Sequence, residues 1–126
     1  AGNDTLSGGS GNDSHSDHSG NDPILGCPWP DLISGGSGAD RLNDGDGSDL
    51  VYGGSGNDTV TASTGYDRVY GGDGNDQLSG GNDIYEDLYG GAGDDTIIAG
   101  SAEIDWVYGG SGNDSLDGGD GNFDLV

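Results

Sequence analysis

The chain has 126 residues, among them 30 Gly, 24 acidic residues and only two basic residues, and its formal net charge is −22. So few positive charges exclude a basic patch for nucleic acid, and no apolar run approaches the roughly 20 residues of a membrane span. The low apolar content alone would predict a disordered acidic chain, unless a cation neutralises the charge or a regular repeat builds a thin core.

A nine-residue repeat runs along the sequence and can be written G-G-x-G-x-D-x-U-x, where U is apolar. The acidic residue at its sixth position recurs in chain order as Asp4, Asp13, Asp22, Asp31, Asp40, Asp49, Asp58, Asp67, Asp76, Glu86, Asp95, Asp105, Asp114 and Asp124. Segment 26–34 (GCPWPDLIS) is irregular but keeps this register, and one-residue insertions fall in the units at 80–89, 99–108 and 118–126. Residues 1–126 are therefore interpreted as a single repeat domain.

The apolar position follows each acid by two residues. Its members are Leu6, His15, Ile24, Ile33, Leu42, Val51, Val60, Val69, Leu78, Leu88, Ile97, Val107, Leu116 and Val126, so that only His15 is polar. The six Gly-rich residues of each unit predict a turn, and the three residues x-U-x predict a minimal strand with U pointing inward. Two units make one coil of about 18–19 residues, and about seven such coils stack as parallel strands in an all-β solenoid.

Stacking brings carboxylates of successive coils, such as Asp40, Asp58 and Asp76, close enough to repel one another. A hard divalent cation between the coils removes the repulsion, and Ca²⁺ is favoured because it accepts six to eight oxygens in flexible geometry. Mg²⁺ fits less well, and Zn²⁺ would need ligands such as His15, His18 or Cys27. Cys27 is interpreted either as an idle thiol or as the source of an intermolecular disulfide.

The nonapeptide resembles the repeat of the RTX (repeats-in-toxin) proteins, over essentially the whole chain. The resemblance implies a right-handed parallel β-roll, Ca²⁺ between consecutive coils, secretion to a calcium-rich exterior, and folding only when calcium binds. It also implies that turn carbonyls act as ligands beside the Asp carboxylates. Carried over to this chain, the carbonyl ligands are those of Gly36, Gly38, Gly54, Gly56, Gly72, Gly74, Gly91, Gly93, Gly110 and Gly112.

Alternate units lie on opposite sides of a β-roll, which separates the acids into two series. The first series contains Asp4, Asp22, Asp40, Asp58, Asp76, Asp95 and Asp114, and each member keeps a Gly two residues before it. In the second series this Gly remains at Gly47 and Gly65, before Asp49 and Asp67, which are the better calcium candidates of that side. Metal binding is less certain for the other second-series candidates, Asp13, Asp31, Glu86, Asp105 and Asp124.

All aromatic residues fall in units of the second series. Tyr52, Tyr70, Tyr89 and Tyr108 follow U directly, so we expect them to point outward as a column, with Trp106 exposed beside them. This column either stiffens the sheet or forms a contact face for another copy or a flanking domain. The array begins and stops within a unit, which suggests a processed segment or caps supplied by neighbouring copies.

These features favour a calcium-dependent structural module at the cell exterior or cell surface, either as part of a larger secreted protein or as a building block of a fibre. An enzyme is not favoured, because no nucleophile and base are paired. The alternative is the secretion and folding module of a larger RTX exoprotein such as a protease, lipase, toxin or adhesin. Ice binding is less favoured, because the outward row is irregular: Ser37, Ser55, Asp73, Ala92 and Ser111. The Asn-x-Ser/Thr motifs are interpreted as by-products of the repeat.

Overall fold

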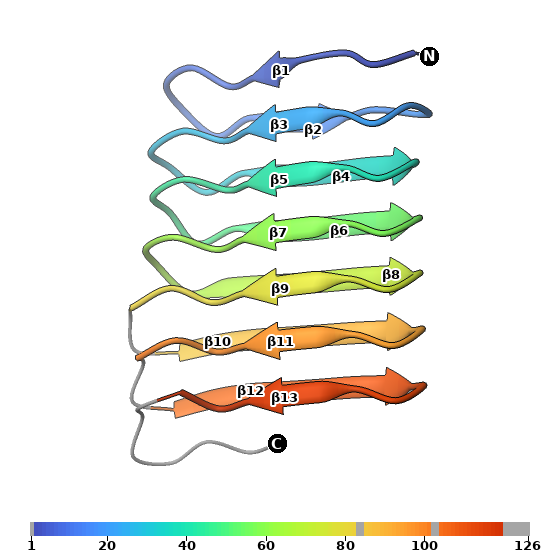
Figure 1. The fold of residues 1–126 in the computed structure, drawn as a ribbon. Helices are drawn as coiled ribbons and strands as arrows, with labels where there is room; N and C mark the ends of the chain where they lie inside the picture. Colours follow the sequence, from blue (N-terminus) through green and yellow to red (C-terminus); the bar gives the residue numbers. More distant parts are fainter. Residues whose placement is uncertain (1, 83–84, 102–103, 120–126) are drawn as a thin grey trace.

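The chain winds as a flattened right-handed coil whose two long faces are parallel β-sheets (Figure 1). The computed structural model describes residues 2–82, 85–101 and 104–119. Within these ranges there is no helix long and apolar enough to cross a membrane. The predicted all-β parallel β-roll is confirmed.

The two sheets differ in the length of their strands. The short-strand sheet contains β1 (Leu6–Ser7), β3 (Pro23–Leu25), β5 (Arg41–Asn43), β7 (Thr59–Thr61), β9 (Gln77–Ser79), β11 (Thr96–Ile98) and β13 (Ser115–Asp117). The long-strand sheet contains β2 (Ser14–Ser16), β4 (Leu32–Ser37), β6 (Leu50–Ser55), β8 (Asp67–Asp73), β10 (Tyr85–Ala92) and β12 (Ile104–Ser111). First-series acids lie in the turns that lead from a long strand to a short one, and second-series acids lie at the opposite edge (Figure 1).

Each strand pairs with the strand one coil away, in a register that places each apolar U residue beside the U residue of the adjacent coil. Leu6 pairs with Ile24, an offset of 18 residues, whereas Leu78 pairs with Ile97, an offset of 19. The long-strand sheet shows the same change, because Val69 pairs with Leu88. The coil therefore lengthens by one residue toward the C-terminus. The insertion that we predict in the unit at 118–126 lies mostly outside the described residues.

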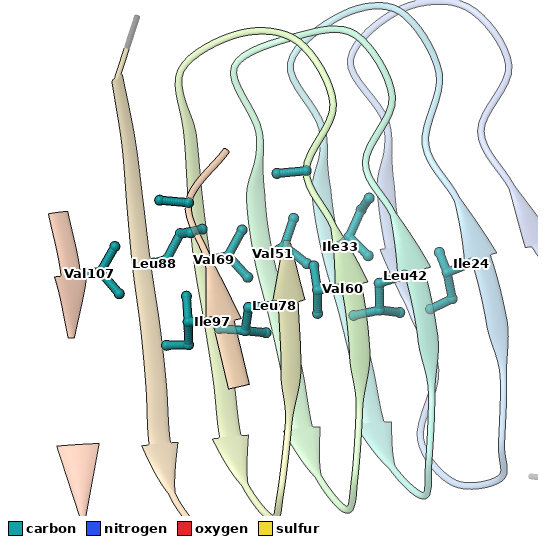
Figure 2. Close-up of a cluster of buried hydrophobic side chains, with 12 residues drawn as sticks. Ile24, Ile33, Leu42, Val51, Val60, Val69, Leu78, Leu88, Ile97 and Val107 are labelled. Carbon is teal, nitrogen blue, oxygen red and sulfur yellow. The ribbon is translucent and has the colours of Figure 1, made fainter. Parts of the chain in front are cut away.

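The core is one narrow layer of aliphatic side chains between the sheets (Figure 2). Its buried members are Ile24, Ile33, Leu42, Val51, Val60, Ala62, Val69, Leu78, Leu88, Ile97, Ala99 and Val107, with Leu6 and Leu116 partly buried against them. His15 takes the same inward position in β2, where its Nε2 is buried without a hydrogen-bond partner. Among the described residues, every U position except His15 thus holds an aliphatic side chain of the core, as the nine-residue period predicts.

The long strands extend further than the three residues expected from the sequence. In β4 and β6 the ladder continues through the first three turn residues, so that Gly36 pairs with Gly54 and Ser37 pairs with Ser55. This happens because successive coils carry the same Gly-Gly-x sequence, which has no side chain to interrupt the pairing. Strand alternation then turns the first residue of the unit inward: Gly53, two residues after Val51, is buried like Val51.

Candidate metal sites in the turns

Most first-series acids are buried, although they are charged residues in a small protein: Asp22, Asp40, Asp58, Asp76 and Asp95. Asp58 is only 1% exposed, and its Oδ1 accepts a hydrogen bond of 2.9 Å from the backbone N–H of Asp40. The backbone N–H of Asp58 in turn donates to Oδ1 of Asp76, at 2.8 Å. The same bond joins every consecutive pair in the series Asp4, Asp22, Asp40, Asp58, Asp76, Asp95 and Asp114. The carboxylates therefore form a continuous ladder along this edge of the roll.

The second carboxylate oxygen has no such partner. Oδ2 is buried without a hydrogen bond in Asp22, Asp40, Asp58, Asp76 and Asp95. An ionised oxygen in that state is costly unless a positive charge approaches it. The protein cannot supply one, because its two basic residues lie elsewhere: Arg41 is exposed on β5, and Arg68 is paired with Asp87 on the outer face of the long-strand sheet.

Oxygen atoms from two coils converge beside the first glycine of each of these turns. A Cβ added to Gly53 would lie 2.6 Å from Oδ2 of Asp58 and 2.5 Å from the carbonyl oxygen of Gly71 in the next coil. At Gly35 the corresponding distances are 2.5 Å to Oδ2 of Asp40 and 2.6 Å to the carbonyl oxygen of Gly53. Carboxylate and carbonyl oxygens are the hard ligands that Ca²⁺ prefers. The donor set is thus all oxygen and fits Ca²⁺.

These first-glycine carbonyls were not among the ligands predicted from the sequence, which named the glycines at the second and fourth positions of each turn. The predicted glycines all adopt positive φ, for example +120° at Gly54 and +125° at Gly56. A Cβ at either position would overlap a carbonyl oxygen of the preceding coil, that of Gly36 or Gly38 respectively. The turns therefore require glycine at these positions because backbone oxygens pass so close, whichever carbonyls hold the metal.

Five second-series acids are buried too, namely Asp31, Asp49, Asp67, Glu86 and Asp105, but their turns are less uniform. A carboxylate ladder joins Asp13, Asp31, Asp49 and Asp67. Glu86 accepts a 2.7 Å bond from the backbone of Gly81 in its own turn. The methyl groups of Ala62 and Ala99 occupy the buried first position of their units, where most first-series turns have glycine. Asp105 is also fully buried, and Asp124 lies outside the described residues.

Two further acids join the turns, and the sequence reasoning missed both. Asp17 and Asp44 replace the glycine at the first position of their units. The structure groups Asp4 with Asp17 and Asp22, and Asp44 with Asp49 and Asp67, so that one carboxylate oxygen from each member lies within 4.8 Å of the others. The signal that could have revealed them was strand alternation, since the first position lies two residues after U and faces inward with it.

Burial makes several of these carboxyl groups hold protons more tightly than usual. It is the main cause that raises the pKa of Asp58 and Asp76 to about 6, with neighbouring carboxylates adding to the effect. Burial also raises the pKa of Asp49 to about 6 and the pKa of Asp44 to about 8. In both groups the negative charge of Asp67 raises the pKa further. A bound cation would therefore have to displace protons from these turns near neutral pH.

The fifth residue of the first-series turns forms a second ladder that the sequence did not suggest. Oδ1 of Asn57 accepts a 2.9 Å bond from the backbone of Asn75, and Oδ1 of Asn75 accepts one from Asp94. The donor in this ladder belongs to the later coil, whereas in the aspartate ladder it belongs to the earlier coil. Asn at this position is therefore a structural partner of the adjacent coil.

The outer face of the long-strand sheet carries the predicted aromatic column. The rings of Tyr52 and Tyr70 stack with centroids 5.1 Å apart, and those of Tyr70 and Tyr89 with centroids 4.9 Å apart. Tyr89 and Tyr108 are tilted, with centroids 6.4 Å apart. Tyr108 is 64% exposed and Trp106 is 54% exposed. The column is thus an open aromatic surface.

Comparison with known families identifies the repeat. The family model for the RTX calcium-binding nonapeptide repeat matches four copies, at residues 1–14, 30–60, 52–84 and 89–122. These matches cover most of the chain, which therefore belongs to this family. No curated protein and no solved structure matches the chain significantly.

Proposed function

We propose that the chain is a calcium-binding structural repeat module of a secreted or cell-surface protein, and that it folds when Ca²⁺ binds. The observation that carries this proposal is the column of buried first-series carboxylates in which an unpartnered Oδ2 lies beside a carbonyl oxygen of the next coil, as in Asp40, Asp58, Asp76 and Asp95. Proteins with RTX repeats are typically secreted, and calcium at millimolar concentration is characteristic of the cell exterior.

Calcium would couple neighbouring coils electrostatically. Asp58, for example, would contribute its Oδ2 from one coil while Gly71 contributes its carbonyl from the next, so that one ion joins two coils. Without the ion, the repulsion within a chain of net charge −22 opposes stacking, and the aliphatic layer is too thin to overcome it. Metal binding and folding should therefore occur together.

The test is a calcium titration followed by far-ultraviolet circular dichroism. In excess chelator the β-signal should be lost, and Ca²⁺ should restore it at a lower concentration than Mg²⁺ does. Asp76→Asn should raise the calcium concentration at the midpoint by about tenfold, because it removes the charge of a buried ligand but preserves its shape. The matched control is Asp73→Asn, an exposed acid of the same turn, which should shift the midpoint little. A spectrum unchanged by chelator would refute the proposal.

We also propose that the aromatic face packs against a second copy of the chain, which would allow assembly into an extracellular fibre. Its support is the stacked tyrosine column, which exposes aromatic rings on several successive strands. Replacing Tyr70 and Tyr89 together by serine should lower the mass measured by light scattering in calcium. The control is Thr61→Ser on the opposite sheet. If the unmodified chain and both variants are all monomeric, this face does not mediate self-association.

The main alternative is a folding and secretion module within a larger RTX exoprotein, where the aromatic face would contact a neighbouring domain. Both assignments need the same calcium-dependent fold, so the calcium titration does not distinguish them. The scattering experiment does, because only the first assignment requires isolated copies of the chain to associate.

A further inference from the structure

The cluster of Asp44, Asp49 and Asp67 differs chemically from the sites of the first series. A first-series turn such as the one at Gly53 has no side chain at its first position, where a carbonyl oxygen and a single Oδ2 pack closely. In the second-series turn at 44–49 the same inward position holds a carboxylate. One oxygen from each of the three acids lies within 4.8 Å of the others, so three formal negative charges gather at one point.

The hydrogen bonds of the cluster leave this charge uncompensated. Oδ1 of Asp44 accepts a 2.9 Å bond from the backbone N–H of Ser63, and Oδ1 of Asp49 accepts a 2.7 Å bond from that of Asp31. The second oxygens of Asp44 and Asp49 are buried and have no partner. Asp44 is 0% exposed and Asp49 is 3% exposed, so water cannot solvate these oxygens either.

The composition of the cluster restricts what can balance its charge. The chain has only two basic residues, Arg41 and Arg68, and they lie on the outer faces of the two sheets. The cluster contains no His or Cys, so it offers only hard oxygen ligands. Hard cations that accept several carboxylates in irregular geometry are Ca²⁺ and the trivalent lanthanides, whereas Mg²⁺ keeps most of its waters.

We propose that Asp44, Asp49 and Asp67 form a calcium site that has one more carboxylate than the first-series sites whose first position is glycine, and that it therefore binds Ca²⁺ more tightly than those sites. Asp44 is its distinguishing ligand, at a position where the repeat normally has glycine. This inference deepens the proposed calcium-binding function and rests on it. It also means that the less regular side of the roll contains a site tighter than the glycine-bearing turns at Gly35 and Gly53.

Terbium(III) luminescence can report on the second-series edge that contains this site. The backbone N–H of Trp29 donates a 2.7 Å bond to the carbonyl of Asp46, which places this tryptophan one coil away from the 44–49 turn. First-series turns lie at the opposite edge of the roll (Figure 1), beyond the length of a strand. In a Trp106→Phe background, light absorbed only by tryptophan should therefore excite terbium near Trp29, and added Ca²⁺ should displace that terbium.

The decisive variant is Asp44→Gly, which restores the residue found at this position in the turns at Gly35 and Gly53. It should raise the terbium and calcium concentrations at half-effect by at least about tenfold. Asp44→Asn, which preserves the shape of the side chain, should act in the same direction. The control is Asp46→Asn, an exposed acid of the same turn, which removes the same charge and should change the half-effect concentrations less than twofold.

Each outcome decides the inference. A large shift in Asp44→Gly and Asp44→Asn, without one in Asp46→Asn, supports it. Equal shifts in all three variants would mean that only the overall negative charge of the turn affects binding. Unchanged values in the Asp44 variants would mean that Asp44 is not a ligand. Either result overturns the inference, while calcium binding at the other sites stands. A chain that binds neither Ca²⁺ nor terbium overturns the proposed function as well.

Discussion

Replacing Gly56 by alanine should destabilise the roll severely, because the backbone of the preceding coil occupies the space that the new methyl group would need. Gly56 has φ of +125°, and a residue with a side chain there costs about 1–3 kcal/mol in backbone strain. The added Cβ would also overlap the carbonyl oxygen of Gly38, a backbone atom that cannot rotate away. Moving one coil away from the other adds about 1–3 kcal/mol, as overpacking usually does. The expected loss is therefore about 2–6 kcal/mol.

Gly11 provides a matched control for this variant. It occupies the same fourth position of its unit and has φ of +110°, but a Cβ there would meet no atom within 4 Å. Gly11→Ala should therefore show only the backbone strain. The difference between the two variants measures how much the close stacking of coils contributes.

The assay is denaturant unfolding in saturating calcium, followed by circular dichroism. Gly56→Ala should lower the free energy of unfolding by at least about 1 kcal/mol more than Gly11→Ala does. It should also weaken calcium binding, since the displaced carbonyl of Gly38 is one of the predicted ligands. Equal losses in the two variants would refute the reasoning, because they would show that the distance between coils imposes no constraint on this position.

Two more predictions concern the buried acids and the core. In the calcium-free folded chain, burial raises the pKa of Asp58 and Asp76 to about 6, above the value of 3.8 for an ordinary Asp. The folded form then binds more protons than the unfolded form, so this contribution to stability is complete below pH about 3.8 and is lost as the pH rises through about 6. Acidification of the calcium-free chain should accordingly increase its β-signal in circular dichroism, and a flat profile would contradict this. In calcium, Leu88→Ala should cost about 2–5 kcal/mol of unfolding free energy. Leu25→Ala, at a residue 49% exposed on the outer face of the short-strand sheet, should cost far less in the same denaturant assay.

The register of the fold could be predicted from the sequence because the period fixes two inward rows at once. The acid at the sixth position and the apolar residue two places later are both buried, as at Asp58 and Val60. Insertions did not obscure this pattern, since one extra residue between Leu78 and Leu88 lengthens a turn and leaves the strand pairing intact. Such a pattern depends only on side-chain direction, which alternation determines.

The candidate sites were only partly predictable. From the sequence we predicted that the Asp series lines a metal-binding edge, but we assigned the first residue of each unit to the turn. In the structure that residue continues the strand and faces inward, which is why Asp44 and the carbonyl of Gly71 were not predicted as ligands. Trp29 also shows that local sequence preference does not determine the turn, because it replaces a turn glycine and still adopts φ of +124°. The stack of neighbouring coils, rather than local preference, imposes the shape of the turn there.

The two hydrogen-bond ladders also give the roll a polarity. From one coil to the next, the backbone of each first-series Asp donates to the carboxylate of the later coil, as Asp40 does to Asp58. The Asn ladder runs the other way, as Asn75 donates to Asn57. The upper and lower surfaces of a coil therefore present different arrangements of donors and acceptors. A further coil continues both ladders when it stacks in the same orientation as the preceding ones, so the two ladders define a direction along the axis of the roll.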